Sequence, residues 1–163
     1  MNDFVKTAKA IAETAHEGQL YDGGPYFINH VEKVAARARA SLAFCPMLEA
    51  VCYLHDVIED TSVTPQDLIE ARMPILVVTA VVEMTHEPDV SYMEYLWEFK
   101  SELGILCKFL DMTENLSNNP SAKNKMKYEM GLEFFRLRHA NVLRMYGLIA
   151  QQYATETVTA AFV

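Results

Sequence analysis

The sequence has no long hydrophobic run and few cysteines. Its longest apolar stretch, residues 75–82, is interrupted by Thr79 and is far shorter than the roughly 20 residues a membrane helix needs. We therefore expect no membrane association, and the first residues also lack the pattern of a signal peptide. The three cysteines, Cys45, Cys52 and Cys107, contain no CxxC pair, which excludes a disulfide scaffold and favours reduced thiols in a cytoplasmic protein.

Basic residues are also scarce. The chain has 22 acids against 14 bases, a formal net charge of −8, which argues against binding to duplex nucleic acid. A phosphorylated substrate stays compatible with this charge, because a bound metal can supply positive charge locally. Apolar residues, in contrast, make up 51% of the 163 residues, so we expect one folded domain over residues 1–163 and no disordered chain.

Apolar residues recur at helical spacing along nearly the whole chain. The pattern predicts an all-α domain, a compact bundle of about seven or eight helices, although the Val-rich residues 77–82 could also form a strand. Residues 21–24 and 85–90 are expected loops, and Gly104 is expected to separate two helices. After the N-terminal helix, the expected helices begin near Pro25, Pro46, Pro65, Pro74, Ser91, Ile105 and Ser121.

Three polar sites interrupt this apolar pattern: residues 55–60 (HDVIED), Asp111 and His30. Burying a carboxylate without a partner costs several kcal/mol, so each buried acid needs a cation, a strong hydrogen-bond donor or a metal. Lys108, one helical turn before Asp111, could serve that acid. Asp56 has no such neighbour, because residues 47–61 contain no Lys or Arg. This absence indicates a metal.

The spacing supports a metal site. His55 and Asp56 diverge by about 100° around a helix but can converge on one ion near a helix end. Two imidazoles and two carboxylates suit Mn²⁺ or Fe²⁺, with Zn²⁺ and Mg²⁺ as alternatives. Glu59 and Asp60 follow His55 and Asp56 by four residues, so each lies on the same helical face as a candidate ligand. The expected chemistry is metal-assisted hydrolysis of a phosphate ester.

Three stretches of the sequence resemble the HD superfamily of metal-dependent phosphohydrolases. They are AHEGQLYDGGPYFINHVEKVA (15–35), YLHDVIEDT (53–61) and KFLDMTENLSN (108–118), and they cover the first three-quarters of the chain in the family's order. More narrowly, the chain is similar to the RelA/SpoT-type hydrolases, including their small stand-alone members. An isolated His-Asp pair would be weak support, whereas HDxxED between the other two segments is specific.

The resemblance implies a helical HD fold and a single metal, usually manganese. Known members remove the 3′-pyrophosphate from guanosine tetra- or pentaphosphate, and some animal members act on the 2′-phosphate of NADPH. The partner implied is therefore a small phosphorylated nucleotide. The resemblance implies His30, His55, Asp56 and Asp111 as ligands, Glu59 and Asp60 as the acids that activate water, and Asn115 as a residue near the nucleotide.

Departures from the family pattern concern the part that recognises the base. Where the hydrolases tend to have a basic pair, this chain has Tyr21 and Asp22; Tyr21 could still stack on a base, but Asp22 would repel phosphate. Val31 replaces a usual proline, and residues 116–118 (LSN) replace a basic segment. The residues therefore support metal-dependent hydrolysis as the reaction better than they support guanosine tetraphosphate as the substrate.

Other candidate substrate contacts have two interpretations each. The Gly24 backbone could approach a phosphate or simply form a turn before Pro25. Lys108 could position substrate, or pair with Asp111 for about 0.3–0.5 kcal/mol if exposed. Lys33 and Arg37 could line a phosphate path or form a solvated helix face.

Three functional hypotheses follow. The leading one is a phosphohydrolase whose substrate contacts include Tyr21, Gly24, Lys108 and Asn115. The second is a non-catalytic metal- and nucleotide-binding HD module. The third is a helical assembly protein that uses residues 121–153 as a partner surface, and a homo-oligomer would be compatible with the enzyme hypothesis as well. The tail at residues 155–163 could pack on the body or on another chain.

Overall fold

Helix starts in the structure follow the capping signals of the sequence. In this computed structural model, which describes residues 3–42 and 44–150, Thr64 and Asp67 exchange side-chain-to-backbone hydrogen bonds in a capping box. Ser91 and Glu94 form the same arrangement. Pro46 occupies the first turn of the helix that begins there, where its missing N–H costs nothing. The predicted starts at these three places are confirmed.

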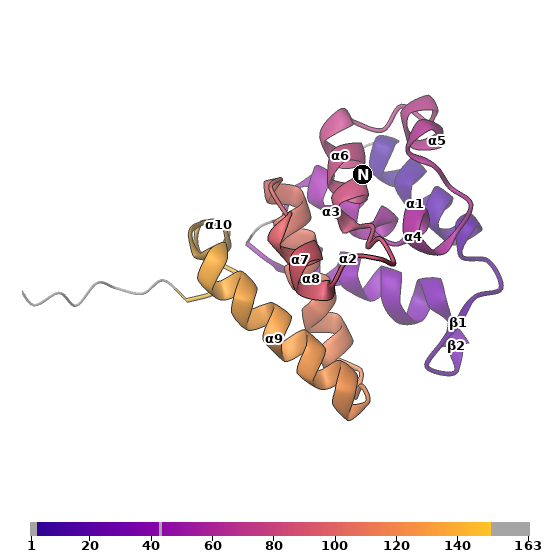
Figure 1. Cartoon of the computed structure of the whole chain (residues 1–163). Helices are drawn as coiled ribbons and strands as arrows, with labels where there is room; N and C mark the ends of the chain where they lie inside the picture. Colours follow the sequence, from indigo (N-terminus) through magenta and orange to yellow (C-terminus); the bar gives the residue numbers. More distant parts are fainter. Residues whose placement is uncertain (1–2, 43, 151–163) are drawn as a thin grey trace, which may run out of the picture.

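The described chain is almost entirely helical (Figure 1). Its elements in order are α1 (Asp3–Ala15), β1 (Leu20–Tyr21), β2 (Gly24–Pro25), the π-helical segment η1 (Phe27–Val31), α2 (Glu32–Ala40), α3 (Pro46–Leu54), α4 (Val57–Asp60), α5 (Pro65–Glu70), α6 (Ile75–Met84), α7 (Tyr92–Trp97), α8 (Glu102–Ser117), α9 (Ala122–Arg138) and α10 (Ala140–Met145).

The predicted all-α class is confirmed, but the helices are more numerous and shorter than predicted. Helix α4 has four residues, and α5, α7 and α10 have six each. The expected break at Gly104 is wrong, because Gly104 lies in the first turn of α8 after the N-cap Ser101. A Cβ at this glycine would lie 2.6 Å from Glu83 Oε2, so close approach explains the glycine. Residues 77–82 are helical within α6.

Helix α3 is the centre of the core. Its seven residues from Leu48 to Leu54 are all buried, and it packs against α1, α2, α6 and α8. The one acid among them, Glu49, accepts a hydrogen bond from the Arg39 guanidinium at 3.0 Å. Because neighbours hold α3 on several sides, the residues that follow it, His55 and Asp56, have a defined position.

A short hairpin and a π-helical segment replace part of the predicted loop and the start of the next helix. Asp22 and Gly23 both have positive φ, 48° and 76°, as a two-residue hairpin turn of type I′ requires. Gly24 lies against the side chain of Asn29, where a Cβ would meet Nδ2 at 2.6 Å. The chain then enters η1, which contains His30, and π-helical turns are frequent at functional sites.

The cysteines of the described chain are free thiols. Cys52 and Cys107 are buried, and Cys45 is half-buried. None of the helices within residues 3–42 and 44–150 combines the length and apolar character that crossing a membrane requires. The tail at residues 155–163, for which the sequence suggests packing on the body or on another chain, lies outside the described residues.

Candidate active site

Four side chains of metal-ligand type converge from separate elements. His30 comes from η1, His55 is the residue after α3, Asp56 is the N-cap of α4, and Asp111 lies in the middle of α8. The break between α3 and α4 turns the chain at Asp56, so that its side chain faces the two histidines. His30, His55 and Asp111 are buried, at 2%, 0% and 4% exposure, and Asp56 is half-buried.

The polar atoms of these residues surround one point. His30 Nε2 lies 3.1 Å from His55 Nε2, 3.5 Å from Asp56 Oδ2 and 3.3 Å from Asp111 Oδ1. His55 Nε2 lies 2.9 Å from Asp56 Oδ2 and 3.7 Å from Asp111 Oδ1. The ligand atoms of His30, His55 and Asp56 all lie within 4.8 Å of one another, and Asp111 joins this cluster through both histidines.

These separations fit a single metal ion. Zn²⁺ and Mg²⁺ hold nitrogen and oxygen ligands at about 2.0–2.2 Å, so neighbouring ligands are about 2.8–3.0 Å apart in an octahedral site and about 3.3–3.6 Å apart in a tetrahedral one. The tautomer of His55 also fits: its Nδ1 donates to the Cys52 carbonyl at 2.8 Å, which leaves the Nε2 lone pair facing the cluster. The four residues, His30, His55, Asp56 and Asp111, can therefore hold a divalent cation.

The neighbouring bases hold both carboxylates of the cluster in their charged form. Burial by itself would lower the pKa of His30, but hydrogen bonds with Asp111 and Asp56 outweigh it and raise that pKa to about 10. Burial would raise the pKa of both carboxyl groups. The His55 and His30 imidazoles nevertheless hold the pKa of Asp56 well below its usual range, and Lys108 with His30 does the same for Asp111. Two carboxylates thus share a site that a metal cation can balance.

A second set of hydrogen bonds orients the carboxylates. The Tyr26 hydroxyl donates a short hydrogen bond to Asp56 Oδ2. Asn115 Nδ2 donates to Asp111 Oδ1 at 2.6 Å, and Asn115 Oδ1 accepts from the Tyr21 hydroxyl at 3.2 Å. Hydrogen bonds to ligands from outside the coordination sphere typically fix their orientation in metal sites. Tyr21 and Asn115, both predicted substrate contacts, are thus connected to the cluster.

Lys108 pairs with the far side of Asp111. Its ammonium lies 3.0 Å from Asp111 Oδ2, and it also sits 5.2 Å from the centre of the Tyr95 ring. Burial opposes the charged form, yet the carboxylate of Asp111 raises the pKa of Lys108 well above its ordinary value. The ion pair with Asp111 is present as the sequence allows, and Lys108 also lines the cavity described below. The substrate contact of Lys108 stays a prediction.

Glu59 and Asp60 lie at the exposed edge of the site. Glu59 Oε2 accepts a hydrogen bond from the His86 backbone N–H at 2.9 Å. Burial, with the added repulsion of Asp56, raises the pKa of Glu59 and of Asp60 above their ordinary values. Raised carboxyl pKa values near a candidate metal site are typical of groups that exchange protons with water.

A glutamine clamps the segment that carries Asp60. Gln19 Nε2 donates to the Asp60 backbone carbonyl at 3.0 Å, and Gln19 Oε1 lies 2.8 Å from His16 Nδ1. Because the amide NH₂ faces Asp60, the amide oxygen faces His16, and His16 Nδ1 is therefore the donor. His16 is 2% exposed and its ring packs on Tyr26 at 4.9 Å between centroids. The ring packing of His16 on Tyr26 depends on the fold and leaves no signal in the sequence.

A polar cavity of about 210 Å³ opens over the cluster. Eight of the ten predicted site residues line it; His55 is buried and lies outside the lining, while Gly24 lies in the hairpin and does not reach it. Four lining residues were not predicted as site residues: Tyr26, Tyr92 from α7, and Lys127 and Tyr128 from α9.

The sequence could have indicated some of these four residues but not others. Tyr26 lies in the quoted segment four residues before His30, so its position on the same helical face could have indicated it. Tyr92 opens α7, where aromatic residues at helical spacing are more typical of packing than of a site. Lys127 and Tyr128 follow Asp111 by more than a dozen residues and reach the cavity only because α9 packs back against α8. Arg37, by contrast, does not line the cavity. Its Nε donates a hydrogen bond to Glu114 Oε2 at 2.5 Å.

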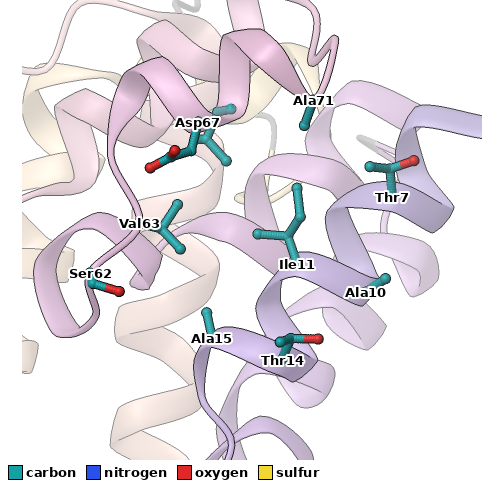
Figure 2. A pocket seen from close by; sticks show the side chains of 10 residues that line it. Thr7, Ala10, Ile11, Thr14, Ala15, Ser62, Val63, Asp67 and Ala71 are labelled. Carbon is teal, nitrogen blue, oxygen red and sulfur yellow. The ribbon is translucent and has the colours of Figure 1, made fainter.

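A larger cavity of about 620 Å³ lies elsewhere, between α1 and the segment that joins α4 to α5. Figure 2 shows its walls, which include Ile11, Ala15 and Val63. Its one carboxylate, Asp67, is occupied in the capping box of α5. This cavity is mainly apolar, and its lining contains no cluster of titratable groups.

The fold is shared with a solved structure. That structure belongs to a metazoan ortholog of SpoT, described as hydrolysing ppGpp and playing a role in starvation responses. The match has a TM-score of 0.69 and 20% sequence identity, and it covers 91% of this chain and 98% of the other. No family model matches the sequence. The resemblance to HD-type hydrolases is thereby confirmed at the level of the fold.

Proposed function

We propose that this protein is a metal-dependent phosphohydrolase that removes a phosphate or pyrophosphate from a small nucleotide. The convergence of His30, His55, Asp56 and Asp111, with nitrogen–oxygen separations of 2.9–3.7 Å, is the observation that carries the proposal. This donor set suits Mn²⁺ first, then Fe²⁺, Zn²⁺ or Mg²⁺. Such an ion, when bound, polarises phosphoryl oxygens and lowers the pKa of water.

Glu59 and Asp60 would manage the protons of the reaction. One of these carboxylates takes a proton from the attacking water as the water oxygen bonds to phosphorus. The bond between phosphorus and the ribose oxygen then breaks, and the ribose oxygen takes up a proton. The raised pKa values of both acids support this role, because a base works best when its pKa approaches the working pH. The hydrogen bonds from His86 and Gln19 would hold this segment in place.

The basic groups of the cavity would receive the phosphates. Lys108 and Lys127 both line it, and Lys127 lies 4.4 Å from the centre of the Tyr92 ring. Tyr21 and Asn115 would contact the nucleoside; their position in the cavity lining beside Asp111 supports this role. The Gly24 backbone stays a prediction of the sequence, because the hairpin holds it outside the cavity wall.

The substrate class we favour is a nucleotide with a phosphate group on its ribose. Guanosine tetraphosphate is the first candidate, because the fold is shared with a protein described as hydrolysing ppGpp. NADPH is the second, through the resemblance of the sequence. Asp22, at the hairpin turn, replaces a residue that is usually basic in this fold family. The three free thiols favour a reducing compartment and therefore support a cytoplasmic location.

A nucleotide panel with Mn²⁺ tests the proposal. We expect release of phosphate or pyrophosphate from at least one ribose-phosphorylated nucleotide. Asp60→Asn should lower turnover by about 100-fold or more, in line with the loss of a general base, while Mn²⁺ binding persists. Tight nucleotide binding without turnover across the panel would favour the non-catalytic module. Full activity in Asp56→Ala would contradict metal-dependent hydrolysis.

A further inference from the structure

Helix α9 has two apolar faces. One face buries Leu132 and Phe135 against the body of the molecule. The other exposes Met126, Met130 and Leu137, which are 63%, 53% and 75% accessible. At about 100° per residue, these three lie within about 40° of one another and roughly opposite Phe135. A helix that packs on the body through one apolar face needs no second apolar face for the stability of the single chain.

Helix α7 extends the exposed face. Trp97 is 54% exposed and its ring lies 5.9 Å from that of Phe134 in α9. Met93, one turn before Trp97, is 37% exposed. Figure 1 shows α9 along the edge of the molecule, with the core helices on one side of it only. Contiguous exposed apolar residues of this kind mark interaction surfaces. We call this the α7–α9 face: Met93, Trp97, Met126, Met130, Phe134 and Leu137.

We propose that the α7–α9 face is where a second copy of this chain docks, with the two α9 helices antiparallel about a two-fold axis. Self-association through one patch on both copies is the commonest symmetry of oligomers. The spacing of Met126, Met130, Glu133 and Leu137 is 4, 3 and 4 residues, which is the spacing of a helix–helix seam.

Glu133 selects the antiparallel arrangement. In a parallel pair, each seam residue faces its own copy, and two Glu133 carboxylates would meet. In an antiparallel pair that places Met126 opposite Leu137 of the second copy, Glu133 lies opposite Met130. The Glu133 carboxylate can then turn toward Arg136 of its own chain, whose guanidinium is 3.8 Å away.

The charges beside the seam complement each other in the same register. Glu129 and Arg136 lie on one flank of α9, within about 20° of each other around the helix. Antiparallel pairing brings this flank against the same flank of the copy, with Glu129 next to Arg136 of the second chain, twice by symmetry. Both side chains are available, at 54% and 47% exposure. Lys125 lies on the same flank, about 20° from Arg136, and its ammonium is 3.9 Å from Glu129 within one chain.

The size of the face sets the expected strength. A helix of 17 residues is about 26 Å long. Two such helices with their α7 flanks form a small interface. We expect it to bury less than about 1,200 Å², the area at which the range for stable, specific complexes begins. We therefore expect a reversible dimer. The proposal does not rest on hydrolysis, and its test requires no turnover.

Sedimentation velocity of the full chain over a hundredfold concentration range tests the proposal. The wild type should show a monomer–dimer equilibrium. In Met130→Lys and in Leu137→Lys, the dissociation constant of the dimer should be about tenfold higher or more than in the wild type. Ile69→Lys is the matched control, because Ile69 is 46% exposed on α5, far from α9, and should leave the equilibrium unchanged. A monomer at every concentration, or a dimer that tolerates both lysines, would overturn the proposal.

A charge swap tests the antiparallel register. Glu129→Arg alone and Arg136→Glu alone should each weaken the dimer, because each puts like charges together. The double variant should recover the wild-type dissociation constant to within about twofold. Circular dichroism checks that α9 persists, since Arg136 also lies 5.8 Å from the centre of the Phe109 ring. A double variant as weak as the singles would overturn this register.

Discussion

Replacing Tyr26 with phenylalanine removes a hydroxyl that donates to the Asp56 carboxylate and leaves the ring in place. The bond is charge-assisted and half-buried, and hydrogen bonds to charged groups are worth about 1.5–3 kcal/mol. Loss of a partner of a metal ligand typically lowers metal affinity about 10–100-fold, which corresponds to about 1.4–2.7 kcal/mol. The two ranges agree. We therefore expect Tyr26→Phe to weaken Mn²⁺ binding about 10–100-fold in calorimetric titration.

Tyr128→Phe is the matched control. Tyr128 lines the same cavity from α9, but its hydroxyl is not among the donors to the four clustered residues. We expect its Mn²⁺ affinity to stay within about twofold of the wild type. Equal Mn²⁺ affinity in Tyr26→Phe and the wild type would refute the reasoning that this hydroxyl orients a metal ligand.

Three further predictions concern the clamp, the charge network and the core. Gln19→Ala removes the hydrogen bond to the Asp60 carbonyl, so kcat should fall about 2–10-fold with Mn²⁺ affinity unchanged, as steady-state kinetics and calorimetry would show. Burial would raise the pKa of Glu32, but its bonds to Lys9 and to Arg39, the latter 2.7 Å long, outweigh burial and lower that pKa. The stability that Glu32 contributes is therefore complete above the unfolded-state pKa near 4.3, and it is lost as the pH falls through the folded-state pKa. Glu32→Gln should thus cost about 1–2 kcal/mol at neutral pH and less in acid, as urea unfolding against pH would show; a constant difference would contradict this. Leu54→Ala should lower the free energy of unfolding by about 2–5 kcal/mol, and a loss under 1 kcal/mol would show that α3 is not the packed centre.

The cluster could be predicted because each member breaks a local rule. Asp56 follows the buried helix α3 and has no Lys or Arg within two turns, and Asp111 sits among Phe109, Leu110 and Met112. Such residues are costly unless something balances them, so the sequence alone indicates a shared cation. The structure brings them together with His30 and adds Lys108 as a partner of Asp111.

The rest of the site depends on tertiary contacts that leave no local pattern. The π-helical segment at His30 has only five residues, which are too few to show a spacing different from that of the α-helix predicted there. Gln19 and Asp60 are 41 residues apart, and their bond depends on how the segment after α1 lies against the end of α4. Lys127 enters the cavity only through the return of α9 along α8. Gly104 shows the converse, since close approach to Glu83 explains a glycine that looks like a helix break.

Calorimetric titration of Mn²⁺ into metal-stripped protein tests most directly whether His30, His55, Asp56 and Asp111 form a metal site. We expect one ion per chain in the wild type. Asp111→Asn keeps the shape of the side chain but removes its charge, and we expect its Mn²⁺ affinity to fall about 100-fold or more. Wild-type protein without saturable binding, or an Asp111→Asn variant that binds as tightly as the wild type, would contradict the metal site and the hydrolysis proposed on it.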